Sequence, residues 1–341
     1  MNRRKFLASL AVVPLASPWR AAAQGVEKTK VTIATGGRSL FAYLPMNLAD
    51  VLGFFDEEGL STDISEFPGG SKVTQALVGG SADFANTVFD QAIRLQARHQ
   101  DIRGVVANTD YPYYVVLLPK SRAETYKGPA DLKGLKIGVT SPGSGSEVFV
   151  QLILAKAGLS SADVSIVQVG GGAGSIAAMR HGGIDAISSL DPVISELEAT
   201  GLFSAVADSR TAAGVREYYG EEYLSACLLA RQEFIEKNPK TVQAVVNAQV
   251  RACRWLAGAT PDMVIAALRP EWIGSNKVIY RASLGKALEG MSKDGRMGEK
   301  AVHNVYLSLI AIDRNVADAK DLDLANTRTN VFVEVALRKY P

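Results

Sequence analysis

The amino-acid sequence predicts an α/β protein with two similar lobes, each a mainly parallel sheet flanked by helices, joined by two crossover strands. A glycine-rich segment supports the two-lobe prediction, because five of the fifteen positions from 69 to 83 are identical to those 102 residues later. Strand-like and helix-like segments alternate, which indicates sheets covered by helices on both faces. Neither crossing between the lobes is rich in Gly, Ser or Pro, which favours a hinge over a flexible tether. Two lobes in one chain imply a cleft where a small ligand binds.

Residues 1–23 have the features of a cleaved export signal. Arg3, Arg4 and Lys5 precede an apolar stretch over 6–16, and three alanines end at Ala23, where we expect cleavage. The apolar stretch is about half of the roughly 20 residues needed to span a bilayer, so we expect no membrane anchor in the mature chain. The paired arginines before Phe6 are similar to the twin-arginine export motif, and an ordinary Sec signal is the alternative. Either route predicts a periplasmic protein.

Removal of the leader changes the charge of the chain. The sequence has 37 basic and 35 acidic residues, and the leader holds four of the basic ones and no acid, so the mature charge is about −2 rather than +2. This balance gives no support for nucleic-acid binding. The roughly 318 remaining residues suffice for two domains. We expect Cys227 and Cys253 to pack as small apolar side chains, and whether they pair stays open.

The elements of the first lobe follow from periodicity. The sequence predicts strands at 31–34, 62–67, 82–85 and 105–108, and helices from about 42, at 72–78 and at 88–98. An apolar run at 113–118 is predicted as a strand that leaves this lobe. The first part of lobe I is therefore placed at 24–117.

The second lobe repeats this scheme over 118–224. The predicted elements are strands at 136–139, 164–169, 186–188 and 205–207, a helix at 147–157 and another after the glycine turn. A strand at 225–230 returns to the first lobe. From Pro239 the pattern is helical, with breaks at Pro261, Pro270 and Gly290. Residues 225–341 are therefore assigned to lobe I and the C-terminal helices.

Gly, Ser and Thr concentrate in the loops that follow the predicted strands, at the edge where open α/β sheets bind ligands. Helix N-termini in such loops favour negative charge, so we expect a small polar, anionic solute. The candidate ligand-binding residues are Gly37, Arg38, Ser39, Gly70, Ser71, Asn86, Thr87, Tyr113, Thr140, Ser144, Gly145, Ser146, Gly172, Ala173 and Asp191.

Several candidates have a structural alternative. The serines at 39, 71, 146 and 175 fit as helix N-caps. Arg38 is either a counter-charge for an anion or a solvent-exposed side chain. Asp191 precedes a proline and therefore fits as a helix N-cap. If its side chain faces the cleft instead, the carboxylate would accept a hydrogen bond from an amino group of the ligand. Tyr113, with Tyr111 and Tyr114 beside it, forms either an aromatic wall at the hinge or part of the core.

Signatures of catalysis and metal binding are missing from the sequence. Residues 170–175 approach a dinucleotide fingerprint, but Ser175 replaces its last glycine or alanine. There is no Walker A sequence and no Gly-x-Ser-x-Gly elbow. The histidines at 99, 181 and 303 lack metal-ligand spacing. We therefore expect no enzyme, no cofactor and no metal.

Three segments resemble one family of binding proteins. They are LGFFDEEGL at 52–60, LVGGSADFA at 77–85 and DLKGLKIGV at 131–139. These segments, with the glycine turn at 69–71, resemble the solute-binding proteins of ABC importers for sulfonates, taurine, nitrate and thiamine pyrimidine precursors. The resemblance covers about residues 30–255. It implies a type II periplasmic-binding-protein fold, in which two lobes close on a ligand.

The resemblance also implies a function. We expect a monomeric periplasmic receptor that delivers its solute to an ABC permease in the inner membrane. A periplasmic ligand-binding sensor is an alternative. A pyrimidine-precursor synthase of the same fold is a more distant one, because the synthase carries a cysteine-rich motif that this chain lacks. Sulfonates, carboxylates, nitrate-like ions and nitrogen heterocycles all fit the loops, so the identity of the solute stays open.

Overall fold

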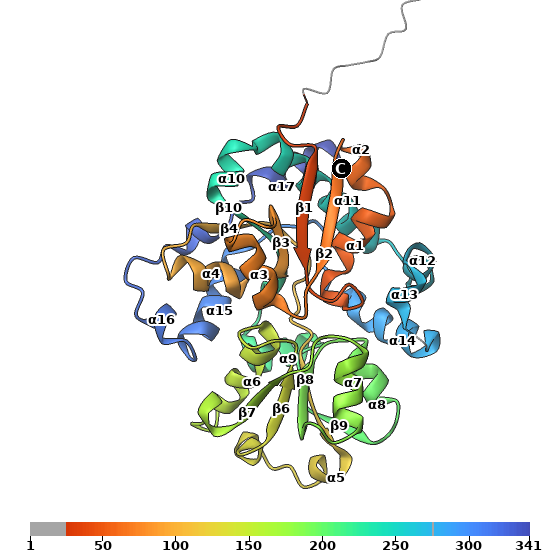
Figure 1. Cartoon of the computed structure of the whole chain (residues 1–341), viewed down its shortest axis with the longest axis vertical. Helices are drawn as coiled ribbons and strands as arrows, with labels where there is room; N and C mark the ends of the chain where they lie inside the picture. Colours follow the sequence, from red (N-terminus) through yellow and green to blue (C-terminus); the bar gives the residue numbers. More distant parts are fainter. Residues whose placement is uncertain (1–24, 275) are drawn as a thin grey trace, which may run out of the picture.

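Two five-stranded sheets form the centres of two lobes, one above the other in Figure 1. The computed structural model describes residues 25–274 and 276–341, and the export signal predicted at 1–23 lies outside the described residues. The first sheet has the order β2-β1-β3-β10-β4, and the second has the order β7-β6-β8-β5-β9. The first-lobe strands are β1 (Lys30–Thr35), β2 (Ser61–Glu66), β3 (Phe84–Val88), β4 (Ile102–Ala107) and β10 (Ala226–Arg231). The second-lobe strands are β5 (Val115–Pro119), β6 (Lys136–Val139), β7 (Ser165–Gln168), β8 (Ala186–Ser189) and β9 (Phe203–Asp208).

The two sheets share one topology. Strand β1 is parallel to β2 and β3, whereas β10 is antiparallel to β3 and β4. Strand β6 is likewise parallel to β7 and β8, and β5 is antiparallel to β8 and β9. The one reversed strand of each sheet is the strand that arrives from the other lobe. The prediction of mainly parallel sheets joined by two crossovers is confirmed.

The internal repeat occupies the same place in both lobes. Helix α3 (Gly70–Val78) precedes β3, and helix α7 (Ala173–Arg180) precedes β8. The repeated aspartates have one structural role. The carboxylate of Asp83 accepts from Thr32 N at 2.8 Å, and that of Asp185 accepts from Lys136 N at 2.9 Å. Each aspartate therefore anchors its strand to the central parallel strand of its sheet.

The crossovers run over residues 108–114 and 209–225. They contact each other, because Ser209 donates to the Tyr114 carbonyl from both its N–H and its hydroxyl, at 2.9 and 2.8 Å. The predicted end of the first part of lobe I at residue 117 lies too far along the chain. Strand Val115–Pro119 pairs with β8 and β9, so it belongs to the second sheet. The run is buried over Val115–Leu118 and fits either sheet by composition, so the sequence does not identify its partner.

Helices cover both faces of each sheet (Figure 1). On the second lobe they are α5 (Lys120–Ala123), α6 (Gly145–Ala155), α7, α8 (Val193–Glu198) and α9 (Ala212–Tyr219). On the first lobe the earlier ones are α1 (Leu44–Val51), α2 (Phe54–Glu57), α3, α4 (Asp90–Gln96), α10 (Gln232–Lys237) and α11 (Pro239–Ala257). The C-terminal helices of this lobe are α12 (Pro261–Ala267), α13 (Pro270–Ile273), α14 (Lys277–Ala287), α15 (Glu299–Ile310), α16 (Arg314–Ala317) and α17 (Val331–Lys339). Of these, α12, α13 and α14 lie to one side of the sheet, where α14 packs on α8 of the second lobe (Figure 1). The predicted breaks at Pro261 and Pro270 are confirmed as first residues of helices, where proline loses no hydrogen bond.

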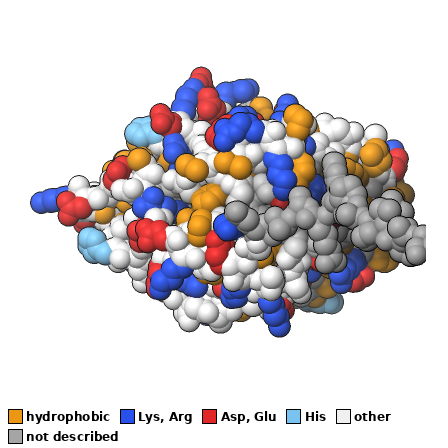
Figure 2. Space-filling model, turned by 90° about the horizontal axis from the view of Figure 1, so that it is seen from above, with side chains coloured by type: hydrophobic (Ala, Val, Ile, Leu, Met, Phe, Trp, Pro, Cys, Tyr) orange, Lys and Arg blue, Asp and Glu red, His pale blue; other side chains and the backbone are white. Residues whose placement is uncertain are grey.

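The surface and the cysteines agree with the composition. Acidic and basic side chains are interspersed on the face shown in Figure 2. Cys227 and Cys253 are both free and fully buried, as expected for small apolar side chains. Over residues 25–274 and 276–341, no helix combines the length and apolarity needed to cross a membrane.

Candidate ligand-binding site between the lobes

Glycines let the two lobes meet at close range. Gly69 caps the start of α3, and a Cβ atom there would lie 2.3 Å from the Ser141 hydroxyl of the second lobe. Gly171 lies just before α7, and a Cβ atom there would lie 2.7 Å from Leu40 Cδ1 of the first lobe. Helices α3 and α7 therefore both begin at the seam between the lobes.

Hydrogen bonds across the seam show that the lobes are closed. The Ser71 hydroxyl lies 2.8 Å from that of Ser141 and donates to the Pro142 carbonyl at 2.7 Å. The Gln91 amide donates to the Gly143 carbonyl at 3.1 Å. At another part of the seam, Phe41 N donates to the Asp191 carbonyl at 3.2 Å.

A small cavity lies inside the closed seam. It holds about 10 Å³, which is about the space that one water molecule needs, so the lobes must separate before an organic solute can enter. Residues of both lobes and of the first crossover line it. They are Gly36, Gly37, Leu40, Tyr43, Gly69, Gly70, Val88, Tyr114, Thr140, Ser144, Gly145 and Leu190. Five of the predicted site residues are among them: Gly37, Gly70, Thr140, Ser144 and Gly145.

Two tyrosines border this cavity, each packed on a glycine. A Cβ atom at Gly36 would lie 2.3 Å from the Tyr43 ring, and one at Gly145 would lie 2.2 Å from the Tyr114 hydroxyl. Burial raises the pKa of both tyrosines, so their hydroxyls stay protonated and can donate. The candidate set omitted both residues, although Tyr114 was considered as part of an aromatic wall. The Tyr43–Gly36 contact has no periodic signature, so sequence reasoning had no signal for Tyr43.

Three hydroxyl groups gather where α6 begins. The Thr140, Ser144 and Ser146 hydroxyls lie 2.8 to 2.9 Å from one another, and Thr140 N donates to Ser146 Oγ at 3.0 Å. The N-cap alternative is wrong for the serines at 71, 146 and 175, because the capping residues of α3, α6 and α7 are Gly69, Ser144 and Gly172. The serine hydroxyl groups are therefore not needed to start these helices.

Two buried hydroxyls at corresponding positions lack hydrogen-bond partners within the described part of the chain. They are Thr87 Oγ1 near the end of β3 and Ser189 Oγ at the end of β8, separated by the 102 residues of the repeat. Thr87 Oγ1 would lie 2.6 Å from a Cβ atom at Gly70, so it faces the start of α3. A buried hydroxyl without a partner costs about 1–3 kcal/mol, which a bound ligand can recover.

The charged candidates are already paired. The Arg38 guanidinium donates to Asp50 at 2.6 Å and to Asn47 at 3.0 Å, and stacks 4.1 Å from the centre of the Trp272 ring. In this closed conformation Arg38 is therefore neither a free counter-charge nor a solvent-exposed side chain. The Asp191 carboxylate accepts from Ser195 N at 2.9 Å and pairs with Arg210 at 3.3 Å. Asp191 reaches the seam only through its main-chain carbonyl.

The other candidates lie around the cavity without lining it. Tyr113 is buried in the core, where its hydroxyl donates to the Ala287 carbonyl at 2.5 Å. The Asn86 side chain donates to Thr35 Oγ1 at 3.1 Å and accepts from Asn108 at 2.6 Å. Ser39 and Gly172 are half-buried, and Ala173 is exposed at the start of α7.

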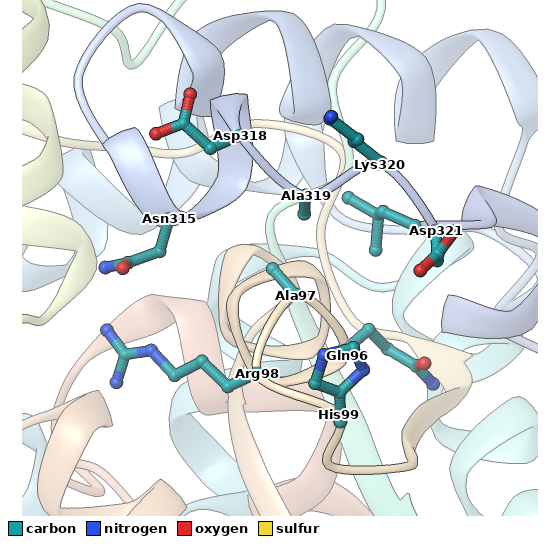
Figure 3. A pocket seen from close by; sticks show the side chains of 10 residues that line it. Gln96, Ala97, Arg98, His99, Asn315, Asp318, Ala319, Lys320 and Asp321 are labelled. Carbon is teal, nitrogen blue, oxygen red and sulfur yellow. The ribbon is translucent and has the colours of Figure 1, made fainter.

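Larger hollows lie outside the closed seam. One of about 400 Å³ lies on the outer surface of the first lobe, where Arg98 and Asp318 stand on opposite sides and no group converges on one point (Figure 3). Another, of about 510 Å³, lies at the edge of the seam between α3, α4 and the Pro142–Gly143 turn. Within residues 25–274 and 276–341, no group of three or more His, Cys, Asp and Glu side chains is placed to hold a metal ion.

The fold and the seam define a two-lobed periplasmic-binding-protein architecture. A family model described as NMT1/THI5 like matches residues 40–262, more than half of the chain, and the chain belongs to this family. A binding protein of Brucella abortus (strain 2308) is 28% identical over 250 residues, which cover 72% of each chain. The 4-amino-5-hydroxymethyl-2-methylpyrimidine phosphate synthase of Aspergillus parasiticus is 26% identical over 228 residues, 65% of each chain.

Solved structures share the whole architecture. A protein of Bordetella bronchiseptica RB50 is 43% identical with a TM-score of 0.90, over 93% of this chain and 100% of that one. The alkanesulfonate-binding protein SsuA from Xanthomonas axonopodis pv. citri, bound to MOPS, is 20% identical with a TM-score of 0.66, over 92% and 99%. The periplasmic nitrate-binding protein NrtA from Synechocystis PCC 6803 is 14% identical with a TM-score of 0.70, over 92% and 90%. At these last two identities the likeness concerns the fold alone.

Proposed function

We propose that this protein is an extracytoplasmic solute receptor of an ABC importer, which closes its lobes around a small polar organic solute and delivers it to a membrane permease. The observation that carries the proposal is the seam, where α3, α6 and α7 begin beside glycines and hydroxyl groups of both lobes. The family, the fold and the named relatives support the same function.

The chemistry of the seam suits an acidic group on the solute. Main-chain N–H groups at helix N-termini bind anions, and glycine allows close approach to the backbone. The hydroxyls of Thr87, Thr140 and Ser146 supply further donors when the lobes close on the solute and the bond between Thr140 and Ser146 rearranges. The paired state of Arg38 indicates that these neutral donors, rather than a counter-charge, hold the acidic group.

A thermal-shift screen of sulfonates, carboxylates, nitrate and nitrogen heterocycles tests the proposal. A solute present at 100 times its dissociation constant stabilises the protein by about 2.7 kcal/mol. We expect at least one compound of the panel to raise the melting temperature in this way. In its presence we expect small-angle scattering to report a more compact particle. No stabilising compound, either in the panel or in a small-molecule extract of cells, would contradict the proposal.

Two further measurements separate the alternatives. Deleting the gene should abolish uptake of the identified solute, whereas a sensor would be dispensable for uptake. The solute recovered after incubation should be chemically unchanged, whereas an enzyme related to the Aspergillus synthase would return a product.

The Thr87→Val variant tests the unpaired hydroxyl. Valine keeps the shape of the side chain, so we expect the melting temperature to stay equal or rise, while solute affinity falls roughly tenfold through one lost hydrogen bond. Thr241→Val is the matched control, because Thr241 is also fully buried but its hydroxyl bonds with Lys28 and Glu27. The control should lose stability and keep its affinity. If both variants show the same changes in melting temperature and solute affinity, Thr87 does not contact the solute.

A further inference from the structure

A second small cavity lies at the hinge and contains a buried acid. It holds about 10 Å³. Its lining includes Asp90 at the start of α4, Tyr114 of the first crossover, Tyr219 and Tyr223 of the second crossover, and Gly145 and Val148 of α6 in the second lobe. It shares Val88, Tyr114 and Gly145 with the cavity in the seam. Because both lobes contribute to both linings, separation of the lobes widens the two cavities together.

Asp90 differs from the other buried acids of the described chain. Asp83 pairs with Lys28 at 2.7 Å, and Asp191 pairs with Arg210 at 3.3 Å. Glu147 accepts from Gly143 N at 2.7 Å and from Gln151 at 2.8 Å. Asp90 is 3% exposed, yet its closest side-chain donor is the Gln91 amide at 3.4 Å.

Neither of two nearby donor groups forms a close pair with Asp90. Arg94, one turn along the same helix, has its Nε atom 3.3 Å from Asp313 without a hydrogen bond, and it acts on Asp90 only through its charge. The Gln91 amide is directed at the Gly143 carbonyl, at 3.1 Å. A buried carboxylate without a close cation is unfavourable, and a buried acid that borders a cavity is a candidate functional residue.

Aromatic rings surround the cavity on the side of the crossovers. The Tyr219 and Tyr223 rings are tilted against each other with their centres 4.3 Å apart, and Tyr219 stacks at 5.8 Å on Phe149, which also stacks on Tyr114. All three tyrosines are buried. Aromatic rings attract cations, and a carboxylate beside them adds a full negative charge.

We propose that Asp90 and the tyrosines at 114, 219 and 223 form a subsite for a positively charged nitrogen of the solute. This inference rests on the proposed function and adds to it the chemical class of the ligand. The nitrogen binds at the hinge, while the acidic group of the same solute binds at the helix N-termini of the seam. Recognition of both ends favours a solute that carries an amine and an acid over the amine-free acid.

Matched pairs of probes test the inference by titration calorimetry after the thermal-shift screen. The pairs are 2-aminoethanesulfonate with ethanesulfonate and 3-aminopropanoate with propanoate, together with every screening hit and its amine-free analogue. We expect the wild-type protein to prefer amino members at least tenfold, and Asp90→Asn to abolish that preference. Asp56→Asn is the control, because it removes the same charge from an exposed position.

The outcomes separate this inference from the proposed function. Hits that bind equally well without a basic nitrogen, or an amine preference that survives in Asp90→Asn, would overturn the inference and leave the receptor function standing. The absence of any hit would overturn both. If Asp90→Asn does not fold, the preference of the wild-type protein for amino members over their amine-free analogues decides whether the inference holds.

Discussion

Gly69→Ala is expected to weaken solute binding by tenfold or more while leaving the free energy of unfolding almost unchanged. The new methyl group would lie 2.3 Å from Ser141 Oγ, 2.9 Å from Thr140 Oγ1 and 3.0 Å from Ser141 Cβ, all in the opposite lobe. Rotation of the Ser141 side chain removes the first contact but not the one with its Cβ atom. The lobes must therefore stop short of closure, and bonds that form only in the closed state are lost.

The same substitution should not strain either lobe. The backbone of Gly69 is extended, with φ −171°, which alanine adopts freely, and its near contacts are all in the other lobe. Isothermal titration with the identified solute measures the loss, and chemical denaturation measures stability. Gly298→Ala is the matched control, because an added Cβ atom there meets nothing within 4 Å. Because the closed seam holds only about 10 Å³, we expect the loops around the cavity to move apart for the solute while Gly69 stays against Ser141. Full affinity in Gly69→Ala would show that these two residues separate in the bound state.

The sequence predicted most of the fold because its periodic patterns are local. The strand at 136–139 was placed without error, and the repeat around Asp83 and Asp185 correctly indicated two lobes of one design. The partner of the run at 113–118 was not predictable in the same way. A fully apolar strand fits the centre of either sheet, and only the path of the crossover decides between them.

The site was predicted less well, because side-chain partners far apart in sequence decide it. The glycine and hydroxyl loops were found, since every open α/β sheet places its strand ends at one edge. Arg38 was expected at the ligand, but Trp272 and Asp50 hold it, and no local pattern connects residue 38 with residue 272. Asp90 was not among the predicted site residues, because its local sequence looks ordinary. An aspartate in the first turn of a helix is commonplace, and only its buried surroundings set it apart.

Asp90→Asn should stabilise the protein at neutral pH and have no effect on stability in acid. Burial raises the pKa of Asp90 from its ordinary 3.8 to about 6, with Arg94 partly opposing the rise and Asp313 adding to it. The folded state thus holds this proton more tightly than the unfolded chain does. The stabilisation is complete below about pH 4 and is lost as the pH rises through 6. The rise of this pKa from 3.8 to about 6 corresponds to about 3 kcal/mol at pH 7.

Denaturant titrations of the wild-type protein and of Asp90→Asn from pH 4 to 7.5 measure this effect as the difference between their free energies of unfolding. Other carboxyls, such as Glu58 with its lowered pKa, change stability with pH in the opposite direction, and they cancel in the comparison. The buried tyrosines and the cysteine near Asp90 keep their protons over this range, because burial raises their pKa values: Tyr43, Tyr114, Tyr219, Tyr223 and Cys227. Asp313, whose charge also acts on Asp90, is present in both proteins. The two curves should coincide near pH 4 and separate by about 3 kcal/mol at pH 7. If Asp90→Asn is less stable than the wild-type protein at pH 7, Asp90 is a structural residue of α4. If the variant is more stable but no longer binds amines, the protein retains a destabilising carboxylate because its ligand needs it.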